Sequence, residues 1–220
     1  MIKAVIFDMD GLLIDSEPLW DEVDATLLKK RGHTLSKEIL HQRVGIGQHA
    51  TVELFKKKFK LSDDESTLLS ERQKTFSELF DKNPRLMPGV DYLVKYLAAK
   101  KLKLAIATGG HTTERVKKFL QHFALDNYIS SITTSHEVKN GKPAPDIFLL
   151  AAHKLKVNPS SSLVFEDAPS GVQAGINAGM VVFGVNSNPE LQNKLKESGA
   201  NEVMSSLVGI NKTFRKYGIQ

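Results

Sequence analysis

Two aspartates near the N-terminus have the spacing of a paired carboxylate site. Asp8 and Asp10 follow directly on the apolar run 2–7. Side chains alternate along an extended chain, so a spacing of two returns both carboxylates to the same side. Carboxylates attack electrophiles, exchange protons with a reacting group and bind cations. The pair is therefore the first candidate site, and Gly11 allows a tight turn immediately after it.

A second pair of carboxylates, Glu166 and Asp167, follows another apolar run at 162–165. Carboxylates at close quarters repel one another, so each gains from a nearby cation. Oxygen ligands with no His or Cys beside them suit Mg²⁺, which also keeps waters and binds a substrate phosphate. We therefore predict a Mg²⁺ site with ligands from both pairs, namely Asp8, Asp10, Glu166 and Asp167.

Two further segments have the composition of an anion site. Thr108 and Gly109 precede a helix-like segment whose candidate N-cap is Thr112 or Thr113. Backbone N–H groups at glycines and at a helix N-terminus bind anions, and Lys142 adds a positive charge from another loop. Together they can hold and neutralise a transferring phosphoryl group. Taken alone, the Thr-Gly-Gly segment is equally consistent with a simple turn.

Strand-like runs precede the segments that carry these side chains. The runs are rich in β-branched and apolar residues, as in strands buried on both faces of a parallel sheet, and lie at 2–7, 102–107, 129–133, 162–165 and 181–185. Helix-period segments lie between them at 90–100, 113–123, 146–156 and 172–178. This alternation predicts an α/β fold with a Rossmann-like parallel sheet and helices on both faces. Ligands of such sheets bind beyond the carboxyl ends of the strands, where the candidate segments would meet.

A long interval without strands separates the first two runs. Residues 16–85 carry three helical stripes and no convincing strand, and proline-containing segments mark both of their ends. We predict a helical cap domain at 16–85, inserted into a catalytic core formed by 1–15 and 86–220.

The composition excludes several classes of protein and of functional site. The 220 residues are 41% hydrophobic and 25% charged and contain no cysteine, which excludes a disulfide scaffold, a Cys-ligated zinc site and a cysteine nucleophile. No stretch is long and apolar enough for a signal sequence or a membrane span, so we expect a soluble cytoplasmic protein without a membrane partner. The net charge is +5, and its densest run, at 56–60, is interpreted as a solvated helix face.

The candidate segments resemble the four motifs of the haloacid dehalogenase-like hydrolases. They read DMDGLLIDSE, ATGG, GKPAPD and LVFEDAPSG, in that family's order and with its insertion between the first two. Within the family the chain is most similar to capped small-metabolite phosphatases, namely the pseudouridine-5′-phosphatase, glycerol-3-phosphatase and sugar-phosphate phosphatase group. The resemblance covers essentially the whole chain.

The resemblance implies a role for each matching residue. Asp8 would be the nucleophile that forms a phospho-aspartyl intermediate, and Asp10 would protonate the leaving oxygen and then activate water. Thr108 and Lys142 would bind the phosphoryl oxygens. Asp167, with Glu166 nearby, would hold Mg²⁺ together with the Asp8 side chain and the Asp10 backbone carbonyl. The implied activity is Mg²⁺-dependent hydrolysis of a small phosphorylated sugar, polyol or nucleoside monophosphate. The resemblance also implies that the cap determines the specificity for the substrate.

Two other functions stay open at this point. The first is a phosphomutase of the β-phosphoglucomutase type, whose relatives carry a cap histidine where this chain has Trp20. They also carry an arginine in a cap loop resembling 44–47, where this chain offers Gln48 or His49. The absence of both groups favours transfer to water. The second is a non-enzymatic anion or nucleic-acid binding module, which only the basic charge supports and the intact motifs oppose.

Three side chains have ambiguous roles. Trp20 could stack on a substrate ring or fill the core of the cap, and His111 could touch substrate because it follows the Thr108 loop. Asp15 is interpreted as a helix cap, with a gating role as the alternative. The remaining histidines are interpreted as surface or packed side chains. We expect a small phosphorylated substrate, no nucleic-acid partner, and a monomer or small homo-oligomer.

Overall fold

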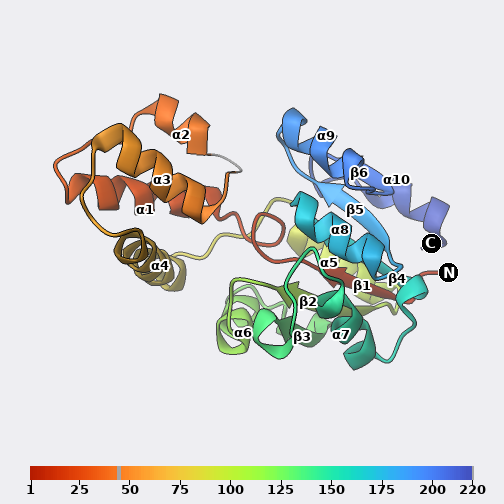
Figure 1. Ribbon diagram of the computed structural model, residues 1–220. Coiled ribbons are helices and arrows are strands. Elements are labelled where there is room, and N and C mark those ends of the chain that lie inside the picture. Colours follow the sequence, from red (N-terminus) through yellow and green to blue (C-terminus); the bar gives the residue numbers. More distant parts are fainter. Residues whose placement is uncertain (44–45, 220) are drawn as a thin grey trace. The chain divides into compact units, whose positions relative to one another are not determined.

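The computed structural model describes residues 1–43 and 46–219, and the chain divides into two compact units. The larger unit consists of Met1–Ile14 and Leu86–Gln220, and the smaller unit is Asp15–Arg85 (Figure 1). The smaller unit is thus the segment 16–85 of the sequence prediction extended by one residue. No helix among the described residues is long and apolar enough to cross a membrane.

A parallel sheet of six strands forms the centre of the larger unit. The strands are β1 (Ala4–Phe7), β2 (Lys103–Thr108), β3 (Ile129–Thr134), β4 (Ser162–Glu166), β5 (Val181–Val185) and β6 (Glu202–Met204). Their order in the sheet is β3-β2-β1-β4-β5-β6, which confirms the predicted Rossmann-like core (Figure 1). The chain order reverses at β1, between β2 and β4, and this is the place where ligands of such sheets bind.

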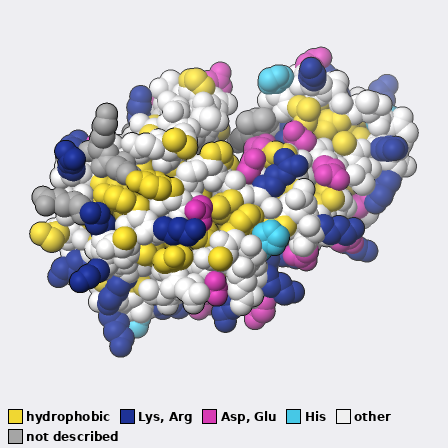
Figure 2. Space-filling model, turned by 180° about the vertical axis from the view of Figure 1, so that it is seen from behind, with side chains coloured by type: hydrophobic (Ala, Val, Ile, Leu, Met, Phe, Trp, Pro, Cys, Tyr) yellow, Lys and Arg dark blue, Asp and Glu magenta, His cyan; other side chains and the backbone are white. Residues whose placement is uncertain are grey.

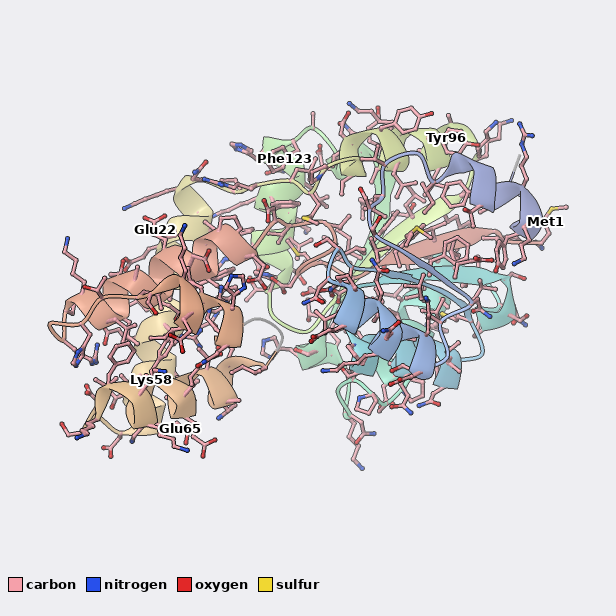
Figure 3. The ribbon with its side chains drawn as sticks, turned by 90° about the horizontal axis from the view of Figure 1, so that it is seen from above. Met1, Glu22, Lys58, Glu65, Tyr96 and Phe123 are labelled. Carbon is pink, nitrogen blue, oxygen red and sulfur yellow. The ribbon has the colours of Figure 1, made fainter. Side chains whose placement is uncertain are left out.

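Helices cover both faces of the sheet, because alternate residues of each buried strand point to opposite sides. Ala4 and Ile6 of β1 pack with α7 (Asp146–Leu155) and α8 (Pro169–Asn177). On the other face, Phe7 stacks on Phe165, which contacts Phe214 of α10 (Asn211–Phe214). Tyr96 of α5 (Val90–Ala99), which is labelled in Figure 3, also stacks on Phe214. Apolar and aromatic layers thus fix the strand ends from both sides.

The larger unit is completed by α6 (Thr113–His122), α9 (Pro189–Glu197) and four short 3₁₀ segments, at Asp126–Tyr128, Ser135–Glu137, Pro159–Ser161 and Arg215–Tyr217. The sequence analysis did not predict α9, β6 or α10. The strand β6 is three residues long and only half-buried, so no apolar run marks it.

The described part of the smaller unit contains only helices. They are α1 (Glu17–Lys29), α2 (Lys37–Arg43), α3 (Gln48–Phe59) and α4 (Glu65–Lys82). The three predicted stripes lie on α1, α3 and α4, whereas α2 was not predicted. Their apolar faces share one core, formed by Leu27, Leu28, Ile39, Val52, Phe55 and Leu68.

Two local predictions for this unit have different outcomes. The N-cap of α1 is Ser16, not Asp15, and it makes no side-chain capping hydrogen bond. The prediction that Asp15 caps the helix is therefore wrong. The charge run behaves as predicted: Lys57 and Lys58 are exposed, while Lys56 donates to the Asp63 carbonyl at 2.6 Å. Figure 2 shows Lys and Arg dispersed over the visible face of the protein instead of gathered in one stripe.

Candidate functional site

Strand ends bring the candidate side chains to one edge of the sheet. Phe7 of β1 is in register with Ile106 of β2 and with Phe165 of β4. The next residue, Asp8, donates its backbone N–H to the Phe165 carbonyl at 3.0 Å. Glu166 is the last residue of β4, so its carboxylate is level with that of Asp8. The register alone therefore explains why acids 158 positions apart meet.

Three carboxylates form a compact group at this edge. Oxygen atoms of Asp8, Glu166 and Asp167 all lie within 4.8 Å of one another. Burial, Glu166 and Asp10 raise the pKa of Asp8 to about 7, against the lowering effect of Lys142. Burial and the charges of Glu166 and Asp8 likewise raise the pKa of Asp167. The negative charges are therefore incompletely compensated by the protein itself.

Lys142 is the cation that the protein places among these acids. Its ammonium donates to both Asp8 and Glu166, and its Nζ atom lies 5.0 Å from the centre of the Phe148 ring. Burial lowers the pKa of Lys142, but the carboxylates of Asp8 and Glu166 outweigh that effect and raise it. One cation therefore faces three acids.

Hydrogen bonds hold the loop that carries Lys142. Asp146, in the first turn of α7, accepts from the backbone N–H of Asn140 at 3.3 Å and from its side-chain amide at 3.0 Å. Asn177 of α8 donates to the Pro143 carbonyl at 3.2 Å. The loop is therefore attached to both helices that flank it, and Lys142 is held over the acids with little freedom.

Two glycines leave room for the acids. A Cβ atom at Gly171 would lie 1.7 Å from a Glu166 oxygen, a distance that no side chain can adopt. Gly11, whose φ is +73°, would place a Cβ atom 2.1 Å from an oxygen of Asp167. Glu166 also accepts from the Ala168 backbone N–H at 2.9 Å. A side chain at either glycine would therefore displace the neighbouring carboxylate.

The end of β2 and the loop after it carry Thr108 and Gly109, the residues predicted to bind an anion. Thr108 is fully buried, and its hydroxyl oxygen accepts from the Gly110 backbone N–H at 3.2 Å. Gly109 is exposed, and its carbonyl accepts from the Ser135 hydroxyl at 2.9 Å. Thr112 is the N-cap of α6, as one of the two alternatives predicted. The loop therefore presents backbone N–H groups at a capped helix N-terminus.

Asp10 and His111 contact each other at this loop. The Nε2 atom of His111 lies 2.9 Å from Oδ1 of Asp10, and the histidine is only 4% exposed. Asp10 itself is 41% exposed in its side chain and is not part of the carboxylate group described above. His111 was predicted as a candidate substrate contact, and the structure places it on Asp10.

The other candidate side chains belong to the helical unit. Trp20 stacks on Phe76 with ring centres 4.2 Å apart, and the Arg72 guanidinium lies 5.0 Å from its ring centre. Trp20 also lines a cavity of about 270 Å³ together with Gln48 and Arg72. His49 is exposed and contacts Glu65 at 2.7 Å. Of the cap loop 44–47, Val44 and Gly45 lie outside the described residues.

Several supporting side chains escaped the sequence analysis. Asn140, Asp146 and Asn177 fix the lysine loop, and Asn186 donates to the Asp167 carbonyl at 3.3 Å. Only the position of Asn186, one residue after β5, follows the rule used for the other strand ends. Gly171 is the last residue of the LVFEDAPSG motif, but its close approach to Glu166 is known only once α8 is placed.

Three relatives with assigned names are similar to this chain over most of its length. "(DL)-glycerol-3-phosphatase 2" of Arabidopsis thaliana is 38% identical, over 94% of this chain and 88% of the relative. "Phosphorylated carbohydrates phosphatase" of Thermotoga maritima is 32% identical, over 90% and 92%. "Probable pseudouridine-5'-phosphatase" of Drosophila melanogaster is 37% identical, over 94% and 90%. All three are named as phosphatases of small molecules.

The family profile and the solved structures agree with these relatives. The profile described as haloacid dehalogenase-like hydrolase matches residues 5–185, which include all four motifs. The crystal structure of a β-phosphoglucomutase from Clostridium difficile has a TM-score of 0.71 at 25% identity and covers both chains completely. A haloacid dehalogenase-like protein of unknown function from Agrobacterium tumefaciens has a TM-score of 0.82 at 24% identity, over 99% of this chain and 100% of the other, and supports the fold alone.

Proposed function

Since the chain belongs to the haloacid dehalogenase-like hydrolase family, we propose that it is a Mg²⁺-dependent phosphatase of small phosphorylated metabolites. The observation that carries the proposal is the meeting of Asp8, Lys142, Glu166 and Asp167 where the order of the strands reverses. The names of the relatives support phosphate-ester hydrolysis, with substrates of the sugar, polyol or nucleoside monophosphate class.

The residues present fit a magnesium ion. Asp8, Glu166 and Asp167 offer only oxygen ligands, and their mutual repulsion is relieved by a cation. Asp8, Asp167 and the Asp10 backbone carbonyl would hold the ion, with Glu166 beside them. When bound, Mg²⁺ would neutralise charge on the phosphoryl group.

The side chains perform two successive displacements in this proposal. A carboxylate oxygen of Asp8 attacks phosphorus while the ester P–O bond breaks, and Asp10 gives its proton to the leaving oxygen. Asp10, now ionised, takes a proton from water as that water attacks the phosphorus of phospho-Asp8. The P–O bond to Asp8 breaks, so the products are an alcohol and inorganic phosphate and the enzyme is restored.

Positioning and charge stabilisation come from the two other loops. The Thr108 hydroxyl, the Gly109 backbone N–H and the Lys142 ammonium are donors for the phosphoryl oxygens. Their positions are fixed before substrate binds, because the Ser135, Asn140 and Asp146 contacts hold both loops. We assign the choice of substrate to the helical unit, which acts as the cap.

A phosphomutase is the second candidate, and the structural similarity to a β-phosphoglucomutase favours it. A mutase must return the phosphoryl group to a bound sugar instead of to water. The cap histidine expected for that step is replaced by Trp20, whose ring is packed on Phe76. Gln48 and His49 stand where the cap arginine is expected. Both replacements support hydrolysis.

The proposal is tested by measuring phosphate release from a panel of polyol, sugar and nucleoside monophosphates. We expect release with Mg²⁺, none after chelation, and recovery when Mg²⁺ is added back, with Ca²⁺ a poor substitute because it favours more ligands at longer distances. Phosphorus NMR of the same reactions separates hydrolysis from isomerisation. No turnover of any panel member with Mg²⁺ contradicts the proposal, and a phosphorylated isomer without free phosphate identifies a mutase.

A further inference from the structure

The buried histidine of the β2–α6 loop has a contact that the proposed reaction does not explain. The ring of His111 is almost completely enclosed, and its Nε2 atom lies 2.9 Å from Oδ1 of Asp10. Residues 10 and 111 come from loops that follow neighbouring strands, β1 and β2. The contact therefore connects the acid/base aspartate with the loop that binds the phosphoryl group.

The position of His111 is fixed from both sides. Before it, the Gly110 backbone N–H donates to the Thr108 hydroxyl oxygen and closes the turn. After it, Thr112 caps α6 by accepting from the Arg115 backbone N–H at 3.3 Å. The imidazole thus projects from a short segment with little freedom. Its contact with Asp10 transfers that rigidity to a side chain that is otherwise 41% exposed.

The same loop leaves space for the second oxygen of Asp10. A Cβ atom at Gly110 would lie 3.0 Å from Oδ2 of Asp10, so the glycine accepts the carboxylate at close range. Oδ1 is held by His111, and Oδ2 is the oxygen left for exchanging a proton with substrate or water. Held in this way, the Asp10 side chain stays outside the group of Asp8, Glu166 and Asp167.

Resting on the proposed phosphatase function, we infer that His111 is a positioning residue for Asp10. Its N–H donates to Oδ1 in both half-reactions, while Oδ2 first loses a proton to the leaving oxygen and later takes one from water. Without this donor, the Asp10 carboxylate would rotate freely or turn toward a cation at the acidic group. Either movement removes the acid from the leaving oxygen, and misplacement by about 1 Å can cost about 10²-fold in rate.

The test uses two polar replacements of similar size. In His111→Gln the amide nitrogen reaches nearly as far as Nε2 and can still donate to Asp10, whereas in His111→Asn it is too short. For an alkyl phosphate, we expect kcat/KM within about fivefold of the parent in His111→Gln and about 10- to 100-fold lower in His111→Asn. His122→Gln is the matched control, because His122 is exposed at the end of α6.

An activated aryl phosphate separates positioning from damage to the fold. Its leaving oxygen needs little protonation, so His111→Asn should lower kcat/KM for the alkyl substrate much more than for the aryl substrate. A variant that is partly unfolded lowers both values equally and leaves their ratio unchanged. An unchanged ratio, or a faster reaction in His111→Asn, overturns the inference.

A double variant makes the failure of this inference distinguishable from failure of the proposed function. In an Asp10→Asn background, His111→Asn should cause no further loss, because the two side chains act as one unit. Independent, multiplicative losses contradict the positioning role. A parent protein without phosphatase activity refutes the proposed function itself. If Asp10→Asn hydrolyses the substrate slowly while His111→Asn hydrolyses it at the parent rate, only the inference about His111 is refuted.

Discussion

Each unit of the protein buries a group of charged side chains, and the two groups differ in their balance. In the core unit, three acids, Asp8, Glu166 and Asp167, surround the single cation Lys142. In the helical unit, the fully buried acid is Asp24, and two arginines contact it. In the first group the acids outnumber the cation by three to one, whereas in the second two arginines face one buried acid.

In the helical group, the buried acid Asp24 has two cationic partners. Arg72 donates to both oxygens of Asp24, at 2.7 and 3.3 Å, and Arg43 lies 3.3 Å from one of them. Burial raises the pKa of Asp24, and both arginines oppose that rise. Arg43 also contacts Glu17 at 3.1 Å, and Asp21 as well. We interpret this group as structural, and the excess of acid in the core as the mark of a site that acquires its missing charge from a cation.

Among the variants that compare the two charged groups, Asp8→Asn in the core unit should have the largest effect. This change removes the proposed nucleophile, so we expect turnover to fall by roughly 10⁴-fold or more. It also removes one of three repelling acids, so the free energy of unfolding of the metal-free protein should stay the same or increase. Steady-state kinetics and urea denaturation measure the two effects. Activity within about tenfold of the parent would remove Asp8 from the mechanism.

Removing a charge from the helical group should lower the free energy of unfolding, in contrast to Asp8→Asn. Arg72→Leu leaves Asp24 buried without its bidentate partner, and breaking a buried ion pair typically costs about 3–5 kcal/mol. We expect that loss in the free energy of unfolding, measured with urea. Lys30→Ala is the control in the same unit, because its ion pair with Glu71 is exposed and is worth at most about 1 kcal/mol. Equal costs for both variants would contradict the contrast between the two groups.

The acidic excess also predicts how stability depends on pH without metal. The pKa of Asp8 is raised from 3.8 to about 7, so the native state holds its proton more tightly than the unfolded state. Stability should therefore fall as pH rises from about 4 to about 7 and then level off, by at most about 4 kcal/mol. Thermal denaturation in a chelator measures this trend.

Two comparisons identify the group responsible for that trend. Saturating Mg²⁺ favours the ionised carboxylates, so it should weaken or reverse the decline. Asp8→Asn in chelator should show a flatter profile than the parent. The contradicting result is that stability declines identically with pH in three samples: the parent with Mg²⁺, the parent without Mg²⁺, and Asp8→Asn. That result would assign the pH dependence to other groups.

The smallest effect concerns the space around Glu166. In Gly171→Ala the new methyl group meets the Glu166 carboxylate, which must move away. We expect the Mg²⁺ concentration for half-maximal activity to rise about 10- to 100-fold, as for other changes beside a metal ligand. Gln173→Ala, at an exposed position of α8, is the control and should leave that concentration unchanged. An unaltered Mg²⁺ requirement in Gly171→Ala would show that Glu166 does not contribute to metal binding.

The sequence predicts the parallel core well because buried strands are short uninterrupted apolar runs. The run 181–185 coincides with β5, and the other four predicted runs differ from their strands by one or two residues at one or both ends. Two of the missed helices bury little: α2 buries only Ile39 and Arg43, and α9 buries only Leu195. Their patterns are too weak to separate a packed helix from a loop.

Contacts within the site were predictable only where a strand end specifies them. Asp8, Thr108 and Glu166 follow from the rule that parallel strands end at one edge. The partner of His111 does not, because the register of β1 on β2 decides that it meets Asp10. The bidentate contact of Arg72 with Asp24 likewise depends on how α1 packs against α4, which helical periodicity leaves open.

The most direct test of the account is the covalent intermediate on Asp8. Asp10→Asn should react with an activated aryl phosphate in the first step but release phosphate slowly, since the base for water is missing. Rapid acid quench should then show a burst of aryl alcohol close to one equivalent per active site, and peptide mapping should place the phosphoryl group on Asp8. Equal rates of alcohol and phosphate release from the first turnover, with Asp8 unmodified at every quench time, would contradict the account.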